Sequence, residues 1–263
     1  MSGASKPKRT SCLLDVSAVS YLTPNMIRVT LTGPEIGEME NGCEGANCKI
    51  MLPEPGQSRE QFSGQLRDGP RPTVRTYTVR FMRRDANEMD IDFVDHGDAG
   101  PASAWARAAT PGAFCGFAGP GPVKIASFYA DRYLVVADMS ALPVAAATLE
   151  AMPRGAKGHA IFEITDADDW QDIDAPFGVK QHWIVNAHPH RPTGEVVKLA
   201  RQLAVGQGRL QTCIAGESSM IKELRQFLHN ELGVPREDTY ISGYWKIGLI
   251  EDEHQKMKRA ELA

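Results

Sequence analysis

The chain has 263 residues, 42% hydrophobic and 24% charged, a balance typical of a soluble globular protein with one large domain or two ordinary ones. Its formal net charge of −4 argues against general nucleic-acid affinity, which usually shows as a basic excess. The longest apolar run is broken by Asp138 and Pro143 and is too short for a membrane span. No apolar segment follows the basic N-terminus, so we expect no secretory signal and a cytoplasmic protein.

The first half of the chain, to about Val123, predicts short strands separated by turns. The segments MIRVTLTG, CKIMLPEP and EMDIDFVDHG end at glycine or proline, and the last alternates Met89, Ile91 and Phe93 with acidic residues. Several such strands close together indicate a small antiparallel barrel. Residues 54–72 are polar and rich in glycine and proline, which predicts a long mobile loop.

One helix is predicted within this half, in the segment GDAGPASAWARAAT. Pro101 suits the first helical position, and Gly97 and Gly100 precede it. A glycine-bearing turn that leads into a helix N-terminus offers free N–H groups and a positive dipole to an anion, above all to a phosphate. A plain helix cap between two strands is the alternative interpretation.

Beyond about Ala126, predicted strands alternate with helices. The segment RYLVVADMSALPVAAATLEAMP reads as a strand, a turn and a helix that starts near Pro143; HAIFEIT and QHWIVNA read as strands, EVVKLARQLAV as a helix, and LQTCIAGESSMIKELRQFLHNEL as a strand and a helix. This order predicts a parallel sheet with helices on both faces, in which ligands bind beyond the carboxyl ends of the strands. No Gly-x-Gly-x-x-Gly fingerprint stands at those ends. The predicted domains are residues 1–126 and 127–263.

The cysteines and histidines suggest no metal centre. Five scattered cysteines are unlike a disulfide framework, and Cys43 and Cys48 have no second pair of ligands at a suitable spacing. The segment HPH, His188 to His190, also lacks partners. No general acid, nucleophile or metal-ligand set is visible in the sequence.

The segment RTYTVR, residues 75–80, places an arginine, a tyrosine and a hydroxyl residue on one barrel strand. An antiparallel barrel that carries this set and is followed by an open α/β sheet resembles flavin-dependent reductases of the ferredoxin-reductase type. The resemblance implies that Arg75 neutralises the flavin diphosphate, that Tyr77 stacks on the isoalloxazine ring, and that Thr78 hydrogen-bonds the ring or the ribityl chain.

Further segments in order make the resemblance more specific. Together with RTYTVR, the segments DFVDHGDAGPASAWA, PGAFCGFAGPGP, ADMSALPVAAA, AGESSMIKELR and GYWKIG resemble the siderophore-interacting proteins, which are flavin-dependent ferric-siderophore reductases. The resemblance covers about residues 16–248, and HGDAGPASAWA and GYWKIG are its most specific parts. It implies an FAD-binding barrel domain followed by an α/β domain similar to NAD(P)H-binding domains.

The family motifs also imply site residues. Those assigned to cofactor binding are Arg75, Tyr77, Thr78, Val79, Asp92, Val94, His96, Gly100, Pro101, Ala102, Ser103, Ser140, Ala141, Tyr244 and Trp245. Tyr244 and Trp245 would lie near the flavin, and core aromatics that close the two domains together are the alternative interpretation. Lys49 and Lys246, with Arg132 as a weaker third, match basic residues linked to ferric-siderophore binding, and solvated surface lysines are the alternative.

The implied reaction is one-electron reduction of a ferric siderophore, which releases the iron because hard oxygen donors hold ferrous iron far more weakly than ferric iron. The resemblance implies no catalytic residue beyond the flavin. The electrons would come from NADH, NADPH or a reduced ferredoxin. The acidic segment TDADDW, residues 165–170, favours NADH over NADPH, which Lys180 or Arg191 would reverse. One departure from the family is ADMSALP, from Ala137, where members commonly read GDETALP. The alternative functions are a general flavin or quinone reductase and a non-catalytic ferric-siderophore-binding protein. We expect the protein to be a monomer.

Overall fold

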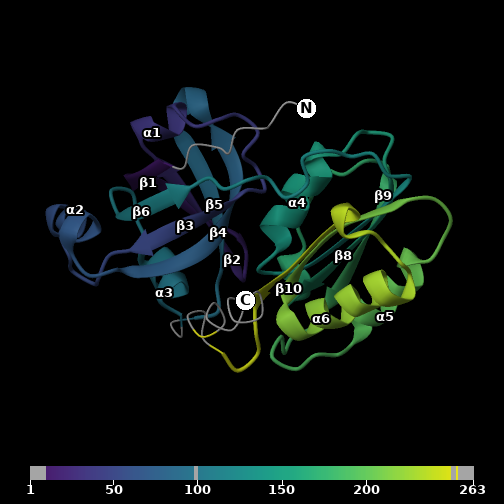
Figure 1. The fold of residues 1–263 in the computed structure, drawn as a ribbon. Helices are drawn as coiled ribbons and strands as arrows, with labels where there is room; N and C mark the ends of the chain where they lie inside the picture. Colours follow the sequence, from purple (N-terminus) through teal and green to yellow (C-terminus); the bar gives the residue numbers. More distant parts are fainter. Residues whose placement is uncertain (1–9, 98–99, 250–252, 254–263) are drawn as a thin grey trace. The chain divides into compact units, whose positions relative to one another are not determined.

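The computed structural model describes residues 10–97, 100–249 and 253, and it contains two compact units, residues 1–123 and 124–263 (Figure 1). The first unit is a closed antiparallel barrel and the second is built on a parallel sheet, so the predicted fold class is confirmed. Within the described ranges, no helix is long and apolar enough to cross a membrane.

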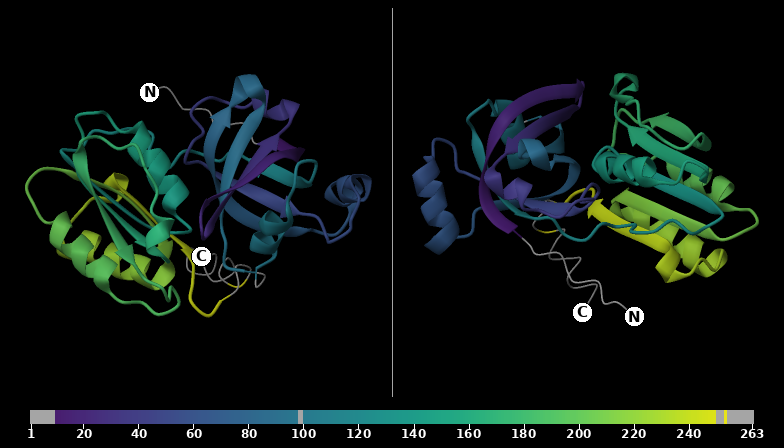
Figure 2. Two further views of the ribbon diagram at one scale, coloured as in Figure 1. Left: turned by 180° about the vertical axis from the view of Figure 1, so that it is seen from behind. Right: turned by 90° about the horizontal axis from the view of Figure 1, so that it is seen from above.

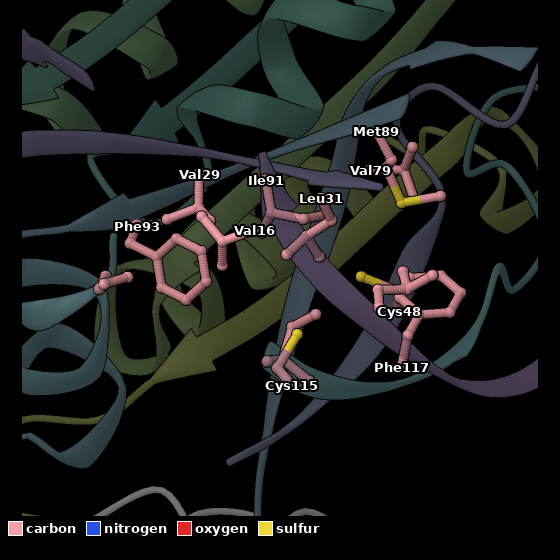
Figure 3. Close-up of a cluster of buried hydrophobic side chains, with 14 of the residues drawn as sticks. Val16, Val29, Leu31, Cys48, Val79, Met89, Ile91, Phe93, Cys115 and Phe117 are labelled. Atoms are coloured by element: carbon pink, nitrogen blue, oxygen red, sulfur yellow. The ribbon is translucent and has the colours of Figure 1, made fainter. Parts of the chain in front are cut away.

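The barrel unit has six strands in the order β1-β2-β5-β4-β3-β6, and β6 pairs back with β1 to close it. Because successive side chains of a strand point to opposite faces, every second residue of a strand faces the interior. Ile27, Val29 and Leu31 of β2 are fully buried there. Figure 3 shows Val29 and Leu31 within this cluster of buried side chains. The elements of this unit are β1 (Thr10–Thr23), β2 (Met26–Thr32), α1 (Pro34–Gly37), β3 (Asn47–Leu52), α2 (Arg59–Asp68), β4 (Thr73–Arg83), η1 (Arg84–Ala86), β5 (Glu88–Val94), α3 (Pro101–Ala108) and β6 (Phe114–Gly119).

Asp90 and Asp92 of β5 are buried on its other face, where arginines pair with them. Arg28 donates two hydrogen bonds to Asp92, at 2.7 and 2.8 Å, and Arg83 does the same to Asp90. Burial alone would raise the pKa of Asp90, but the hydrogen bonds from Arg83 and Thr30 outweigh it and lower that pKa. The alternating pattern of β5 therefore separates an apolar inner face from an ion-paired outer one.

The predicted loop over residues 54–72 is wrong in its centre, which forms helix α2, outside the barrel (Figure 2). Ser58 begins the helix with a capping box: its hydroxyl accepts the Gln61 N–H, and the Gln61 side chain accepts the Ser58 N–H. Phe62 is fully buried and packs on Phe114 of β6, with ring centroids 5.9 Å apart. One capped turn and one aromatic anchor thus order a segment whose prolines, with Gly56 and Gly69, lie outside the helix and whose remaining glycine, Gly64, lies within it.

The second unit has a five-stranded parallel sheet in the order β11-β10-β7-β8-β9. Helices α5 and α6 cover one face, and α4 lies on the other (Figure 1). The chain runs outward from β7 to β9 on one side and then adds β10 and β11 on the other, so the topological switch point lies between β7 and β10. The elements of this unit are β7 (Arg132–Asp138), α4 (Leu142–Ala151), β8 (Lys157–Ile164), η2 (Ala167–Asp169), β9 (Gly178–Val185), α5 (Glu195–Ala204), β10 (Leu210–Glu217), α6 (Ser218–Gln226), η3 (Phe227–Glu231), η4 (Arg236–Asp238) and β11 (Thr239–Trp245).

All five cysteines carry free thiols, and four of them are buried. Burial raises the pKa of every one of these thiols far above neutrality. Among the described residues, no group of three or more histidine, cysteine, aspartate or glutamate side chains is arranged to hold a metal ion. The cysteines are part of the packing: Cys48 and Cys115 belong to the barrel core (Figure 3).

Candidate functional site

In the barrel unit, the candidate residues centre on the first half of β4. The ring of Tyr77 lies against Phe93 of β5, with centroids 4.2 Å apart and planes inclined by 42°. Phe93 in turn contacts Trp105 of α3, at 5.7 Å. Tyr77 remains only partly buried, so a row of aromatic rings supports a tyrosine at the margin of the barrel core. Rings held in this way are rigid surfaces for a planar ligand.

The neighbours of Tyr77 on β4 have different environments. Arg75 is partly buried, and its guanidinium donates to the carbonyl of Val74 at 2.9 Å. Thr78 is 4% exposed, and Lys49 of β3 donates to the hydroxyl of Thr76. Val79 is fully buried in the core, its N–H donates to Ala46 and its carbonyl accepts the Gly45 N–H. Val79 is thus occupied by packing and backbone pairing, whereas Arg75, Tyr77 and Lys49 keep partly accessible side chains.

A second part of the barrel site lies where β5 leads to α3, and Asp95 organises it. The Asp95 carboxylate accepts the Gly97 N–H at 3.0 Å, the Ser103 hydroxyl at 3.2 Å and the Tyr21 hydroxyl at 3.1 Å. Burial would raise the pKa of Asp95, but these donors, with Arg107 nearby, lower it overall. An ionised carboxylate therefore fixes the turn to the start of α3.

The N-terminus of α3 has no side-chain cap. Gly100 is the N-cap and has no side chain with which to cap the helix, and Pro101 follows it. A Cβ atom at Gly100 would lie 2.4 Å from Cε1 of His96, so the glycine makes room for the exposed imidazole. Ser103 is 1% exposed, and its hydroxyl donates to Asp95 while accepting the His96 N–H.

These features fit an anionic group at the start of α3. Proline has no N–H, so the N–H groups of Ala102 and Ser103 are the first of the helix, and they have no partner within it. Ala102 is small, and the hydroxyl of Ser103 is already used, so the backbone of both residues is what a phosphate would meet. The diphosphate of FAD suits this donor set. Of the other predicted residues, Val94 is partly buried at the end of β5, and Asp92 is paired with Arg28.

In the second unit, the candidate residues gather at the carboxyl ends of β7 and β11. Asp138, the last residue of β7, accepts the N–H and the hydroxyl of Ser140, at 2.9 and 2.6 Å, and the N–H of Ala141 at 3.3 Å. Trp245, the last residue of β11, donates its indole N–H to the other oxygen of Asp138 at 2.7 Å. Burial raises the pKa of Asp138 despite these donors.

The remaining candidates of this unit lie apart from one another. The Tyr244 hydroxyl meets that of Tyr240 at 3.1 Å, and Lys246 directly follows the end of β11. Arg132 begins β7 at the opposite edge of the sheet, where it donates to the carbonyls of Ala204 and Gly206. The structure therefore brings Ser140, Ala141 and Trp245 together around Asp138, and it does not bring Arg132 to the edge where Lys246 lies.

Sequence reasoning missed Asp95 and Asp138 as the organisers of these two parts. Asp95 stands between a strand and a glycine turn, and an aspartate there often accepts the N–H of the residue two positions on, which was a readable local signal. The bond from Asp138 to Trp245 joins residues 107 positions apart, and no local signal indicates it. The acidic segment 165–170 also has a local structural role, because Asp166 and Asp169 form the capping box of η2.

Comparisons with known proteins agree with this architecture. Residues 15–124 match the model of the siderophore-interacting FAD-binding domain, and residues 130–248 match that of the siderophore-interacting protein. Ferric vibriobactin reductase ViuB of Vibrio cholerae is 34% identical over 259 residues, which cover 95% of this chain and 94% of that protein.

Solved structures show the same likeness. The siderophore-interacting protein SipS from Aeromonas hydrophila is 32% identical, with a TM-score of 0.82 over 96% of this chain and 98% of that one. A ferredoxin NADP+ reductase from Neisseria gonorrhoeae, 12% identical, shares the fold with a TM-score of 0.61 over 89% of this chain and 99% of that one. The identity to relatives over nearly the whole chain and the two consecutive domain matches lead to one conclusion: this protein belongs to the siderophore-interacting protein family.

Proposed function

We propose that the protein is an FAD-dependent reductase that reduces ferric siderophores and so releases ferrous iron. The observation that carries the proposal is the pairing of a supported, partly accessible Tyr77 on β4 with the glycine-capped N-terminus of α3, in a barrel that matches an FAD-binding domain. The relative that is named a ferric vibriobactin reductase supports the choice of substrate class.

The residues of the barrel unit would bind and orient the cofactor. We assign Arg75 and the N–H groups of Ala102 and Ser103 to the diphosphate, because a guanidinium and a helix N-terminus both favour an anion. Tyr77 would stack on the isoalloxazine ring, and Thr78 would hydrogen-bond it. When bound, FAD would supply the electron chemistry, since a flavin accepts a hydride and gives up electrons one at a time.

Lysine side chains would attract the substrate electrostatically. Many siderophore complexes are anionic, and a lysine near an open site acts as a point charge that needs no fixed geometry. We assign this role to Lys49 and Lys246, and we leave out Arg132, whose guanidinium holds the carboxyl end of α5.

The electron donor is a separate part of the proposal. NADH, NADPH and a reduced ferredoxin all suit a flavin, and the capping role of the acidic segment 165–170 weakens its value as a signal for NADH. Anaerobic reduction with each donor in turn would identify the one that bleaches the flavin fastest. We also propose a cytoplasmic monomer, which cell fractionation and light scattering would test.

The deciding experiment is an absorbance spectrum of the purified protein, followed by anaerobic reduction and addition of a ferric catecholate with a chromogenic ferrous chelator present. We expect flavin bands that bleach on reduction and return as the ferrous chelate appears. Reoxidation by quinones or free flavins but not by ferric complexes would indicate a general reductase instead. A chain that binds a ferric siderophore but cannot be loaded with FAD would refute the reductase and leave a binding protein.

A matched pair of variants tests the cofactor assignment. Arg75→Ala removes the guanidinium assigned to the diphosphate and should raise the Kd for FAD by about tenfold or more, the effect of losing one charge-assisted hydrogen bond. Arg71→Ala removes an exposed arginine just before β4 and should leave the Kd unchanged. Equal Kd values for the two variants would remove Arg75 from the site.

A further inference from the structure

At the topological switch point of the second unit, the indole of Trp245 is held by a buried carboxylate from another strand. Sheet order places β10 between β11, which carries Trp245, and β7, which carries Asp138. The 2.7 Å hydrogen bond from Nε1 of Trp245 to Oδ2 of Asp138 therefore passes over the end of β10. The indole is fixed at the edge of the sheet where ligands of such folds bind.

Gly216 of β10 makes this crossing possible. A Cβ atom at Gly216 would lie 2.6 Å from Oδ2 and 2.8 Å from Cγ of Asp138, and the glycine has a φ of +145°. Any other residue would place its side chain where the carboxylate lies and would also strain the backbone. Gly216 thus provides the space in which Asp138 reaches Trp245.

The carboxylate is itself fixed before it meets the indole. Oδ1 of Asp138 accepts the Ser140 N–H, the Ser140 hydroxyl and the Ala141 N–H, and the residue is only 6% exposed. With Oδ1 bound by the turn, Oδ2 accepts the indole N–H, and the backbone of Glu217 also hydrogen-bonds this carboxylate. An amide in its place would have to present an NH₂ group to donors on one side or the other.

The chain around Trp245 is held as well. The Ser218 hydroxyl donates to the carbonyl of Trp245 at 2.8 Å, and Glu217 accepts the Ile247 N–H at 3.3 Å. The ring of His190 meets the indole edge-on, with centroids 5.4 Å apart. Backbone and side chain of Trp245 therefore have defined positions, and Lys246 lies between two anchored residues.

We propose that Asp138 is a positioning residue: it sets the orientation of the Trp245 indole and, through it, of the segment that presents Lys246 to the substrate. This inference rests on the proposed function for the role of Lys246, but the contact that carries it lies wholly within the second unit. Asp138 touches neither cofactor nor substrate in this scheme, and its effect on Lys246 passes through Trp245.

The test is exchange of the Trp245 indole N–H with solvent, followed by NMR of ¹⁵N-labelled protein. The chain has four tryptophans, and the resonance of Trp245 is the one that Trp245→Phe removes. Trp170 is 53% exposed and serves as the internal reference for fast exchange. In the unmodified protein we expect Trp245 to exchange at least about tenfold more slowly than Trp170, and Asp138→Asn should remove that difference.

Steady-state kinetics of the FAD-loaded protein with a ferric tris-catecholate, and with the donor among NADH, NADPH and reduced ferredoxin that reduces the flavin fastest, separates positioning from plain stability. Asp138→Asn should raise the apparent KM several-fold and change kcat little. The control is Thr148→Val, which removes buried contacts to Val144 and Cys213 in the same unit and should lower the melting temperature without altering either KM or indole exchange.

The results separate the inference from the proposed function. Exchange of Trp245 as fast as that of Trp170 in the unmodified protein overturns the inference even if no variant folds. So does an Asp138→Asn variant that matches Thr148→Val in exchange and KM. Failure of the unmodified chain to take up FAD refutes the proposed function, whereas exchange in the cofactor-free chain still decides whether Asp138 fixes the indole.

Discussion

Replacing Asp95 with alanine should weaken FAD binding, because this carboxylate holds the turn that leads to α3. The side chain is 14% exposed and accepts hydrogen bonds from Gly97, Ser103 and Tyr21. Tyr21 is 55% exposed, so its bond contributes little, and the two inner bonds are worth about 1 kcal/mol each. The substitution should therefore destabilise the ordered form of the turn by about 2 kcal/mol.

If FAD restores the order of the turn on binding, that energy is taken from the binding free energy. At about 1.4 kcal/mol per tenfold, the Kd for FAD should rise roughly 30-fold. The assay is quenching of flavin fluorescence as FAD is titrated into the cofactor-free protein. Tyr21→Phe removes only the exposed bond and should change the Kd by less than about threefold. An Asp95→Ala variant that binds FAD as tightly as the unmodified protein would refute the reasoning.

Three further predictions concern the substrate, the response to pH and helix α2. Lys246→Ala should raise the apparent KM for an anionic ferric siderophore several-fold while the flavin content stays constant, and loss of flavin instead would place the lysine in the cofactor site. His159 and His182 hydrogen-bond each other at 3.1 Å, and burial lowers the pKa of both. As the pH drops below about 6.5, the unfolded state therefore binds protons before the folded state does, and the free energy of unfolding should fall. His182→Gln should flatten that dependence in urea titrations, and an unchanged slope would contradict it. Phe62→Ala should lower the free energy of unfolding by about 3 kcal/mol or more, because the side chain is fully buried, and a loss below about 1 kcal/mol would mean that α2 packs only loosely.

The fold class was predictable because strands and helices leave local patterns of apolar and polar residues in the sequence. The alternation of Met89, Ile91 and Phe93 with acidic residues indicates a strand with one apolar face, and the structure buries all three in the barrel core. Helix α2 was missed although Ser58 and Gln61 have capping-box spacing, since the flanking glycines and prolines dominate the composition of that segment.

The site was only partly predictable, because its residue types are visible in the sequence and their contacts are not. Arg75, Tyr77 and the turn before α3 stand out in the chain. The pairing of Asp92 with Arg28 and of Asp138 with Trp245 depends on the order of the strands in each sheet, which brings together residues far apart in the chain. Such contacts follow from topology, and a single sequence does not specify topology residue by residue.

The buried thiols acquire a meaning from the proposed product. Ferrous iron binds thiolates and reacts with peroxide to form radicals, and the thiolate is also the form of cysteine that oxidants attack. Because burial raises the pKa of all five thiols, almost none ionises at neutral pH. A protein that sheds ferrous iron at each turnover would thus offer few thiolates to bind the metal or to react with peroxide, and its cysteines should need no thiol reductant to stay reduced through many cycles.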